Sequence, residues 1–313
     1  MTKLIIVSTL LLASNFPAQA GNDGPIVPRI ARAQSLGANI QVNVNLVLVP
    51  VSVMDLYGRS VTGLQADNFR VLDGPRQVPI VSFSRQDQPI TVGLIFDCSR
   101  SMLTKFKDAR QAPRELFQQL NPDDRSFLIT VSDKAELKRG LTSDFEELQN
   151  FLVFTHPNGM TPLIDGVYMG LQHIRKSPNP RKALVVVSDG GDNHSRYTLS
   201  ELQRLADESD ALIFAAGLYY GRSTQEEQDG PALLSNLCAR TGGANFVIRE
   251  LSGLHDAMVK IGVALHNQYV LGYYPPDDCA SGKYRKIKVS LLATPGLPPL
   301  QIHARAGYYT PER

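Results

Sequence analysis

The chain has 313 residues, which is enough for one large domain and a smaller one. Hydrophobic residues make up 43% of the sequence and charged residues 20%, as in ordinary globular proteins, so a largely disordered chain is excluded. The formal net charge is only +2, and no run of Lys and Arg is long enough to follow a phosphate backbone, so nucleic acid is not expected as a partner.

The first twenty residues have the layout of a cleaved secretory signal peptide. Lys3 gives a positive start, residues 4–13 form an apolar run too short to span a bilayer, and residues 18–20 form a small-x-small cleavage site. A buried N-terminal helix is the alternative, but Pro17 would break it. We therefore predict export to the periplasm, the cell envelope or the medium. No later apolar run is long enough to span a membrane.

Residues 21–38 contain Pro and Gly without a hydrophobic period, which predicts a flexible lead-in. Strand patterns follow over residues 39–88, with turn residues at 57–60 and 73–75. The expected extended segments are 40–48, 49–56, 69–72 and 80–83. This first flank is predicted to contain strands only.

From residue 89 to residue 267, apolar strands alternate with helical segments, which predicts a parallel sheet with helices on both faces. We expect strands at 92–96, 127–131, 183–187, 211–216 and 245–248. We expect helices at 103–120, 145–154, 162–174, 199–206, 232–239 and 254–265. Pro113 should kink the first of these helices because proline removes a helix hydrogen bond.

Residues 268–313 again show strand patterns, at 269–274, 283–292 and 302–309, with a hairpin-like loop at 277–282. Neither flank has enough strands to bury a core alone. We therefore predict that the two flanks pair in one β-sandwich, with the α/β domain inserted into it. Two unrelated β appendages are the alternative.

Three polar segments stand where a predicted strand ends or a helix begins, at residues 97–101, 159–163 and 188–190. The loops at the carboxyl ends of strands are where an open α/β sheet gathers its ligands. The segments offer two carboxylates and three hydroxyls, from Asp97, Asp189, Ser99, Ser101 and Thr161. Such hard oxygen donors suit Mg²⁺, Ca²⁺ or Mn²⁺ better than zinc or copper.

Each segment also has a purely structural explanation. Ser99 and Ser101 could cap the helix that follows them. Thr161 before a proline is an ordinary helix start, and Asp189 with Gly190 could form a turn. The occurrence of all three segments in order, each at the end of an element, favours the metal site.

The pattern Asp-x-Ser-x-Ser at residues 97–101, Thr161 in a Gly-x-Thr-Pro-Leu setting, and Asp189-Gly190 after an apolar strand resemble the metal-ion-dependent adhesion site (MIDAS) of von Willebrand factor A domains. The resemblance covers about residues 89–268 and implies a doubly wound, Rossmann-like, mostly parallel sheet. The flanks, with Tyr-Tyr-Pro at 273–275 and Gly-Tyr-Tyr at 307–309, are similar to exported bacterial proteins classed as acidobacterial-type VWFA-related.

The resemblance implies that the Ser99, Ser101 and Thr161 hydroxyls bind Mg²⁺ (or Ca²⁺ or Mn²⁺) directly or nearly so, with Asp97 and Asp189 acting partly through water. One coordination position would then accept an Asp or Glu carboxylate of a protein partner. Such a site binds and lacks a poised base or nucleophile. We therefore predict a non-enzymatic, adhesion-type binding protein.

Arg100 stands where the family usually has Gly, and could repel the metal, hold a carboxylate or extend into solvent. Residues 219–231, with exposed-looking Tyr219 and Tyr220, are expected to form a loop near the metal, which would shape partner choice or be simply solvated. Of the three cysteines, Cys98, Cys238 and Cys279, the first is predicted to be a small packed residue; their pairing stays open.

Two other functions are alternatives to metal-dependent binding. One is a structural envelope module whose site is metal-free or merely stabilising. The other is a metal-dependent phosphohydrolase with Asp97 as nucleophile, although that class has a second acid two residues later, where this chain has Ser99. The sequence has no Gly-x-Ser-x-Gly, no phosphate-binding Gly-x-x-x-x-Gly-Lys and no His-Glu-x-x-His.

Overall fold

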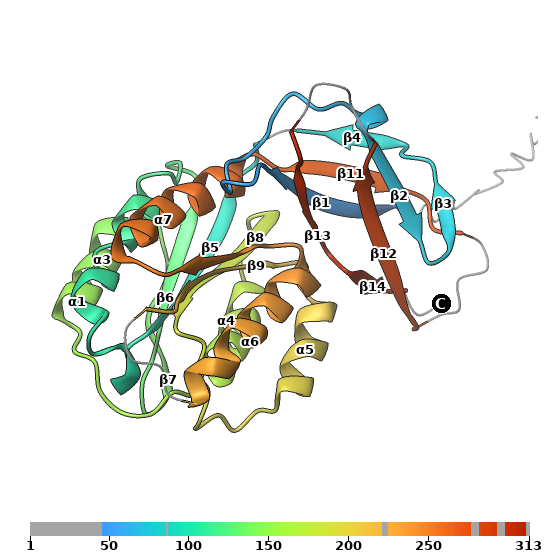
Figure 1. Ribbon diagram of the computed structural model, residues 1–313. Helices are drawn as coiled ribbons and strands as arrows, with labels where there is room; N and C mark the ends of the chain where they lie inside the picture. Colours follow the sequence, from blue (N-terminus) through green and yellow to red (C-terminus); the bar gives the residue numbers. More distant parts are fainter. Residues whose placement is uncertain (1–45, 86, 221–224, 277–281, 293–297, 311–313) are drawn as a thin grey trace, which may run out of the picture. The chain divides into compact units, whose positions relative to one another are not determined.

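The computed structural model of the protein describes residues 46–85, 87–220, 225–276, 282–292 and 298–310 (Figure 1). All of them belong to one compact unit, residues 44–313. The predicted signal peptide, the lead-in, the first residues of the predicted first strand and Cys279 lie outside the described residues. Among the described helices, none combines the length and the apolar character needed to cross a membrane.

The α/β part is built on a six-stranded sheet in the order β10-β9-β8-β5-β6-β7. Its strands are β5 (Ile90–Asp97), β6 (Arg125–Val131), β7 (Ala135–Thr142), β8 (Arg181–Ser188), β9 (Leu212–Leu218) and β10 (Asn245–Ile248). All neighbours are parallel except β7, which is antiparallel to β6 at the edge. Every residue of β5 is buried because helices cover both faces of the sheet.

The helices form two layers. On one face lie α1 (Phe106–Ala109), α2 (Pro113–Phe117), α3 (Phe145–Phe154) and α7 (Leu251–His266); on the other lie α4 (Leu163–Ile174), α5 (Leu199–Glu208) and α6 (Gln225–Thr241) (Figure 1). A short 3₁₀ turn, η2 (Arg100–Met102), follows β5. The side chains of β5 alternate between the two layers, so that Leu94 and Phe96 pack on one and Ile95 on the other.

Two helix predictions were wrong in detail. The helix expected over 103–120 is divided into α1 and α2, and Pro113 begins α2 instead of kinking a continuous helix. Proline suits this first position because the missing N–H would have no helical partner there. The segment expected to be a loop as far as residue 231 is helical from Gln225 onward, with Pro231 inside α6.

The two flanks form a β-sandwich of two four-stranded antiparallel sheets. One sheet has the order β13-β1-β11-β4 and the other β14-β12-β2-β3. The strands are β1 (Val47–Met54), β2 (Phe69–Asp73), β3 (Arg76–Val78), β4 (Ser82–Ser84), β11 (Tyr269–Tyr273), β12 (Tyr284–Leu291), β13 (Gln301–Ala304) and β14 (Gly307–Tyr309), with a 3₁₀ turn η1 (Ala66–Asn68). Strands of both flanks pair in each sheet: β1 pairs with β11 and β13, and β2 with β12. The predicted fold, an α/β domain inserted into a flanking sandwich, is confirmed; the boundaries after residues 88 and 267 stay predictions.

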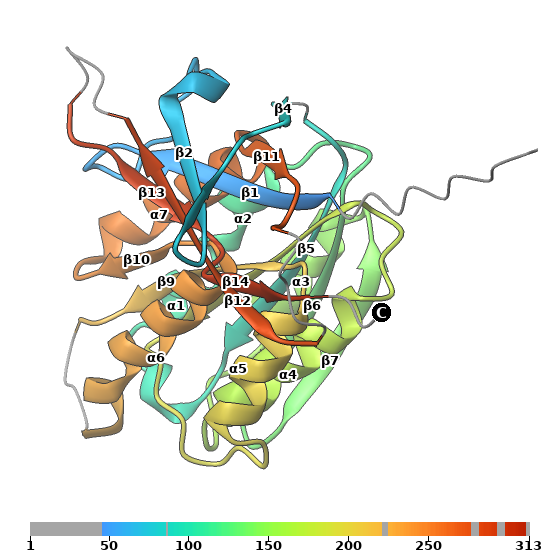
Figure 2. The ribbon, with the colours of Figure 1, turned by 90° about the vertical axis from the view of Figure 1, so that its right-hand side faces the viewer.

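The single strand expected over 302–309 is in fact β13 and β14, which belong to different sheets. The break lies where the chain meets the α/β part: Ala306 N donates to Arg240 O over 3.0 Å. Figure 2 shows α5 and α6 close to β12 and β14, and α5 contacts β14. Packing against these helices therefore interrupts an otherwise strand-like sequence.

A fully buried carboxylate, Asp73, links the two sheets of the sandwich. Its Oδ2 accepts hydrogen bonds from the hydroxyls of Tyr273, at 3.1 Å, and Tyr308, at 2.9 Å. Its Oδ1 accepts from Arg285 Nε at 2.6 Å. Tyr273 and Tyr308, one tyrosine from each of the two tyrosine pairs of the second flank, therefore share one buried charged partner.

The chain passes between sandwich and α/β domain at two adjacent points, before β5 and after α7. There, His266 Nδ1 lies 2.9 Å from Asp87 Oδ1, and His266 Nε2 lies 3.3 Å from Asp124 Oδ2. Arg181 pairs with Asp87 at 3.1 Å and donates to Gln268 Oε1 at 2.9 Å. This junction lies at the start of β5 and β8, so the carboxyl ends of these strands are at the opposite edge of the sheet.

Candidate metal site

Three loops are hydrogen-bonded to one another at the carboxyl edge of the sheet. Asn158 N donates to Cys98 O at 2.8 Å and Arg100 N to Gly159 O at 3.1 Å, which joins the loop after β5 to the segment before α4. Asn193 N donates to Thr161 O at 3.1 Å, and Thr161 N to Asn193 Oδ1 at 2.8 Å, which joins that segment to the loop after β8. The five predicted donor residues therefore lie on segments that are directly connected.

The Asp97 carboxylate is fully buried and both of its oxygens accept hydrogen bonds. The backbone N–H of Ser99 donates to Oδ1 at 2.8 Å, and the Ser188 hydroxyl donates to Oδ2 at 2.6 Å. Ser188 Oγ in turn accepts from Gly190 N at 2.9 Å. These bonds fix the orientation of Asp97 and connect it to the segment that carries Asp189.

The Ser99 and Ser101 hydroxyl oxygens lie 2.9 Å apart. Ser99 precedes η2, but its side chain makes no capping hydrogen bond to that turn. Ser99 is buried and Ser101 is half-buried. The structure therefore does not support capping as the role of Ser99, and the two hydroxyls lie close enough to bind one ion together.

Thr161 is 4% exposed and also has no capping role at α4. The first N–H groups of α4 are satisfied by the loop after β8: Ile164 N donates to Asp192 Oδ1 at 2.9 Å, and Asp165 N to Ser195 Oγ at 3.1 Å. Because the loop after β8 accepts hydrogen bonds from these N–H groups, α4 does not need Thr161 as a capping residue.

Two glycines allow these loops to lie close to neighbouring elements of the fold. Gly190 has φ +82°, and a Cβ on it would lie 2.6 Å from the Gly230 Cα at the start of α6. Gly159 has φ +78°, and a Cβ there would collide with Asp133, whose Oδ1 accepts from Met160 N. Only glycine therefore fits the backbone and the space at position 190.

The charges at the site favour a cation. Asp97 and Asp189 are both 0% exposed, and burial first, then repulsion by Asp189, raises the pKa of Asp97 to about 7. One buried ammonium, Lys105 Nζ, lies 3.2 Å from Asp189 Oδ2. When both carboxylates are ionised they outnumber the ammonium, and the donors are oxygens, so the residues fit a hard divalent cation, which would favour the ionised form of Asp97. The described residues contain no cluster of three or more His, Cys, Asp or Glu that could hold a metal, so the candidate site depends on hydroxyls.

Ser188 and Lys105 are the functional candidates that sequence reasoning missed. Ser188 was visible as a polar residue at the end of an apolar strand, which is a usable signal. Lys105 gave no such signal, because it stands two residues before the exposed Lys107 in a similarly polar stretch.

Tyr219 and Tyr220 were wrongly predicted to be exposed. Both are half-buried, their hydroxyl oxygens are buried, and the two rings pack on opposite faces of the sheet. Burial raises the pKa of Tyr219 to about 12. Arg100 is exposed, whereas Cys98 is packed in the core as predicted, with the pKa of its thiol raised by burial. Cys98 and Cys238 are both buried free thiols.

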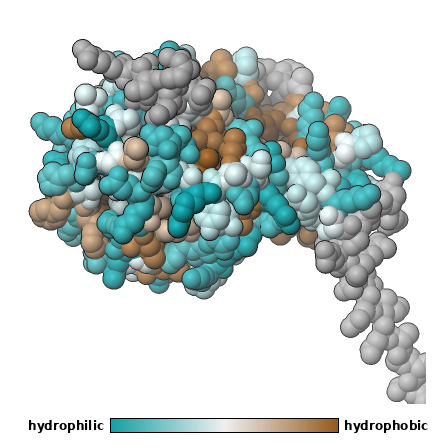
Figure 3. Space-filling view, turned by 90° about the horizontal axis from the view of Figure 1, so that it is seen from below, coloured by the Kyte–Doolittle hydropathy of each residue, from teal (hydrophilic) through white to brown (hydrophobic). Residues whose placement is uncertain are grey.

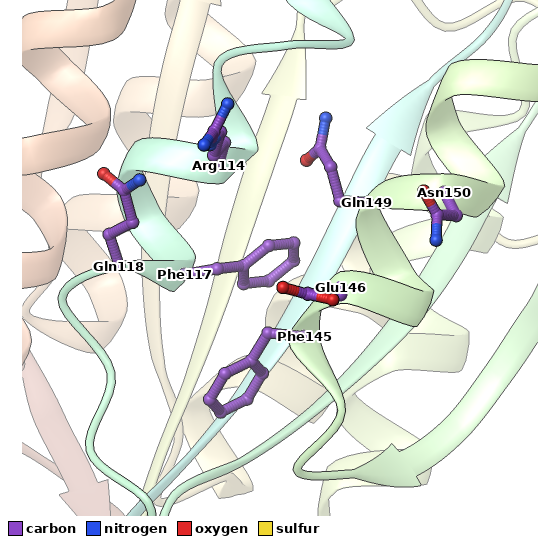
Figure 4. A pocket seen from close by; sticks show the side chains of 7 residues that line it. All are labelled: Arg114, Phe117, Gln118, Phe145, Glu146, Gln149 and Asn150. Atoms are coloured by element: carbon purple, nitrogen blue, oxygen red, sulfur yellow. The ribbon is translucent and has the colours of Figure 1, made fainter.

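A pocket of about 390 Å³ lies between α2 and α3 (Figure 4). Its floor is made by Phe117 and Phe145, whose rings are stacked with centroids 5.8 Å apart. Arg114, Gln118, Glu146, Gln149 and Asn150 complete the lining. None of the five predicted metal donors belongs to it.

The family model described as the von Willebrand factor type A domain matches residues 92–191. A von Willebrand factor type A structure from Catenulispora acidiphila has 12% sequence identity and a TM-score of 0.50, over 83% of this chain and 73% of that one. No curated protein matches the chain.

Two further solved structures are similar to part of the chain. An aerotolerance-related membrane protein from Bacteroides fragilis has 15% identity and a TM-score of 0.46, over 56% of this chain and 98% of that one. Proximal thread matrix protein 1 from the mussel byssus, solved with a zinc-occupied MIDAS motif, has 15% identity and a TM-score of 0.48, over 62% of this chain and 49% of that one. Residues 92–191 therefore match the von Willebrand factor type A domain model, and the fold of the chain is similar to that of the Catenulispora structure.

Proposed function

We propose that this protein is an exported binding protein that uses a divalent cation, Mg²⁺ or else Ca²⁺ or Mn²⁺, to bind an Asp or Glu carboxylate on a protein partner. The residues that would hold the cation are Asp97, Ser99, Ser101, Thr161 and Asp189. The observation that carries the proposal is the set of hydrogen bonds that joins the three donor loops at one edge of the sheet.

The donors divide by their accessibility. Asp97 already accepts two hydrogen bonds, which suits a carboxylate that acts on the cation partly through water. The hydroxyl of the half-buried Ser101 is the donor nearest to solvent, next to the exposed Arg100. When bound, the cation supplies an electrophilic centre with a coordination position for a partner's carboxylate oxygen.

The surface around Ser101 carries both charged and apolar side chains. Arg100 is exposed, and Leu103 and Met160, on the two flanking loops, are 56% and 48% exposed. In Figure 1 the ends of the loops after β5 and β8 lie at the lower edge of the α/β domain, the side seen in Figure 3. That face is mostly hydrophilic with smaller hydrophobic areas, as in the interfaces of non-obligate complexes.

Binding fits the site better than phosphoryl transfer does. A nucleophilic Asp97 would have to expose a carboxylate oxygen, but this residue is 0% exposed and both oxygens accept hydrogen bonds. An assay with a general phosphatase substrate tests this alternative. Metal-dependent turnover that disappears in Asp97→Ala would make the protein a phosphohydrolase.

A pull-down from envelope extract tests metal-dependent binding. We expect a partner that is captured in Mg²⁺, lost in chelator and lost in Asp97→Ala, while Asp256→Ala, a change of a 59% exposed carboxylate on α7, retains it. A partner that binds equally in chelator and to Asp97→Ala would identify a structural module that does not depend on metal.

Export has a separate test. The mass of the protein purified from its native cell should correspond to a chain that begins at Gly21, because the predicted cleavage site ends at Ala20. A protein that is found in the cytoplasm and retains residues 1–20 would contradict export. The proposed metal site would be unaffected by that result.

A further inference from the structure

Lys105 has an unusual position for a lysine, because its side chain is only 2% exposed. It lies between η2 and α1, and its backbone is fixed on both sides: Lys105 N donates to Met102 O at 2.8 Å, and its own carbonyl accepts from Ala109 N at 2.9 Å. Lysine is rarely buried without a partner of opposite charge. Asp189, one of the five proposed metal donors, is such a partner here.

The ammonium and a metal ion would have to compete for the same carboxylate. Lys105 Nζ lies 3.2 Å from Asp189 Oδ2, and Asp189 is fully buried, so little water screens this pair. A divalent cation bound close to Asp189 would meet a positive charge a few ångströms away in a medium of low dielectric constant. Both charges cannot be held there without a large repulsion.

We propose that Lys105 is a built-in competitor of the metal: its ammonium holds Asp189 in the metal-free protein and moves away from it when the cation binds. This inference rests on the proposed function, since it concerns the same cation and the same donors. The site therefore has two states with the same fold. In one state the Lys105 ammonium pairs with Asp189, and in the other a divalent metal ion is bound.

The exchange has two consequences. In the metal-free protein the Lys105–Asp189 pair reduces the repulsion between buried carboxylates, so it stabilises the fold without metal. In the presence of metal the cost of displacing the ammonium lowers the affinity, so the site fills only where the divalent ion is abundant. A metal ion that binds only one of two conformational states has a lower apparent affinity when the other state is populated.

Calorimetric titration with MnCl₂ tests the competition directly. We compare the unchanged protein with Lys105→Met, which keeps the length of the side chain and removes its charge, and with the control Lys107→Met at an exposed position. Lys105→Met should bind Mn²⁺ on the order of tenfold more tightly, by loss of the competing charge, and should melt at a lower temperature in chelator. Lys107→Met should match the unchanged protein in both measurements.

Binding by Lys105→Met alone, with none by the unchanged protein, would contradict displacement of the ammonium by the cation. Equal or weaker Mn²⁺ affinity in Lys105→Met would overturn it and would leave the metal site standing. If none of the three proteins binds Mn²⁺ or Mg²⁺, the competition and the proposed function are both wrong.

A second measurement uses the unchanged protein and does not depend on the folding of the variant. Acetic anhydride acetylates accessible lysines, and peptide mass spectrometry reports the modified fraction at Lys105 and at Lys107. Saturating Mn²⁺ should increase the acetylation of Lys105 several-fold and leave Lys107 unchanged. Protection of Lys105 that is the same with and without bound Mn²⁺ would contradict the displacement.

Discussion

The Ser188 hydroxyl donates a 2.6 Å hydrogen bond to Asp97 Oδ2 and so joins the carboxyl ends of the neighbouring strands β8 and β5. Groups that orient a metal ligand in this way matter nearly as much as the ligand itself. We expect Ser188→Ala to weaken Mn²⁺ binding about 10- to 100-fold with little change in fold, measured by calorimetry and circular dichroism. The control is Ser200→Ala at an exposed position of α5. Unchanged affinity in Ser188→Ala would show that Asp97 needs no such support.

Gly190 gives a prediction about stability. Gly190→Ala places a Cβ at φ +82° and 2.6 Å from the Gly230 Cα, so it should lower the free energy of unfolding by about 1–3 kcal/mol or more. Urea unfolding measures this change. Gly140→Ala is the matched control, since a Cβ there has no neighbour within 4 Å. Equal stability of the two variants would mean that the loop after β8 shifts freely away from α6.

The sequence predicted the sheet well because its central strands are continuous apolar runs. Residues 90–97 can be buried on both faces and fit no surface element. Strand β7 was missed because residues 135–142, at an edge of the sheet, are polar and largely accessible, and they lack the apolar pattern. The pattern of residues 302–309 predicts one strand, because periodicity indicates an extended chain but not the sheet to which it belongs.

The candidate site was predictable only in part, for a similar reason. The donors Asp97, Ser99 and Ser101 stand close together in the sequence and form a pattern. Lys105 and Asp189 are 84 residues apart. Their ion pair depends on the packing of the loop before α1, which no local pattern reports. A pattern therefore predicted the proposed donors, and the structure was needed to find the buried ammonium beside Asp189.

The sandwich depends on its buried carboxylate. Asp73→Asn removes the buried charge that Arg285, Tyr273 and Tyr308 share, and it breaks the ion pair with the partly buried Arg285 guanidinium. We expect a loss of about 3 kcal/mol in the free energy of unfolding, measured with urea. Asp67→Asn, at an exposed residue of η1, should lose little. An unchanged midpoint in Asp73→Asn would contradict a structural role for the tyrosines of the flanks.

His266 predicts how stability depends on pH. Burial acts to lower the pKa of His266, but Asp124 and Asp87 outweigh it, so the pKa lies above its ordinary value of 6.5. The proton-dependent stabilisation is therefore complete below pH 6.5 and is lost as the pH rises through the folded-state pKa. His266→Gln should remove this loss, which cannot exceed about 1.4 kcal/mol per pH unit for one proton.

At low pH, the stability contributed by the junction around His266 and Asp124 changes with pH in the opposite direction. Burial acts to raise the pKa of Asp124, but hydrogen bonds from His266 and from the Ile90 and Asn121 N–H groups lower it below 3.8. Its stabilisation is present above pH 3.8 and is lost as the pH falls through the lower folded-state value. Urea midpoints between pH 3 and pH 9 test both limits, with His194→Gln, at an exposed loop position, as control. A midpoint difference between His266→Gln and the unchanged protein that does not vary with pH would contradict this assignment.

The most direct test of the metal site is anomalous X-ray scattering from crystals grown with Mn²⁺. We predict one strong anomalous peak within coordination distance of the Ser99, Ser101 and Thr161 hydroxyls, adjacent to Asp97 and Asp189, and no peak in crystals of Asp97→Ala. A peak at another place, or none at saturating Mn²⁺, would show that these oxygens do not form a cation site and would contradict metal-dependent binding.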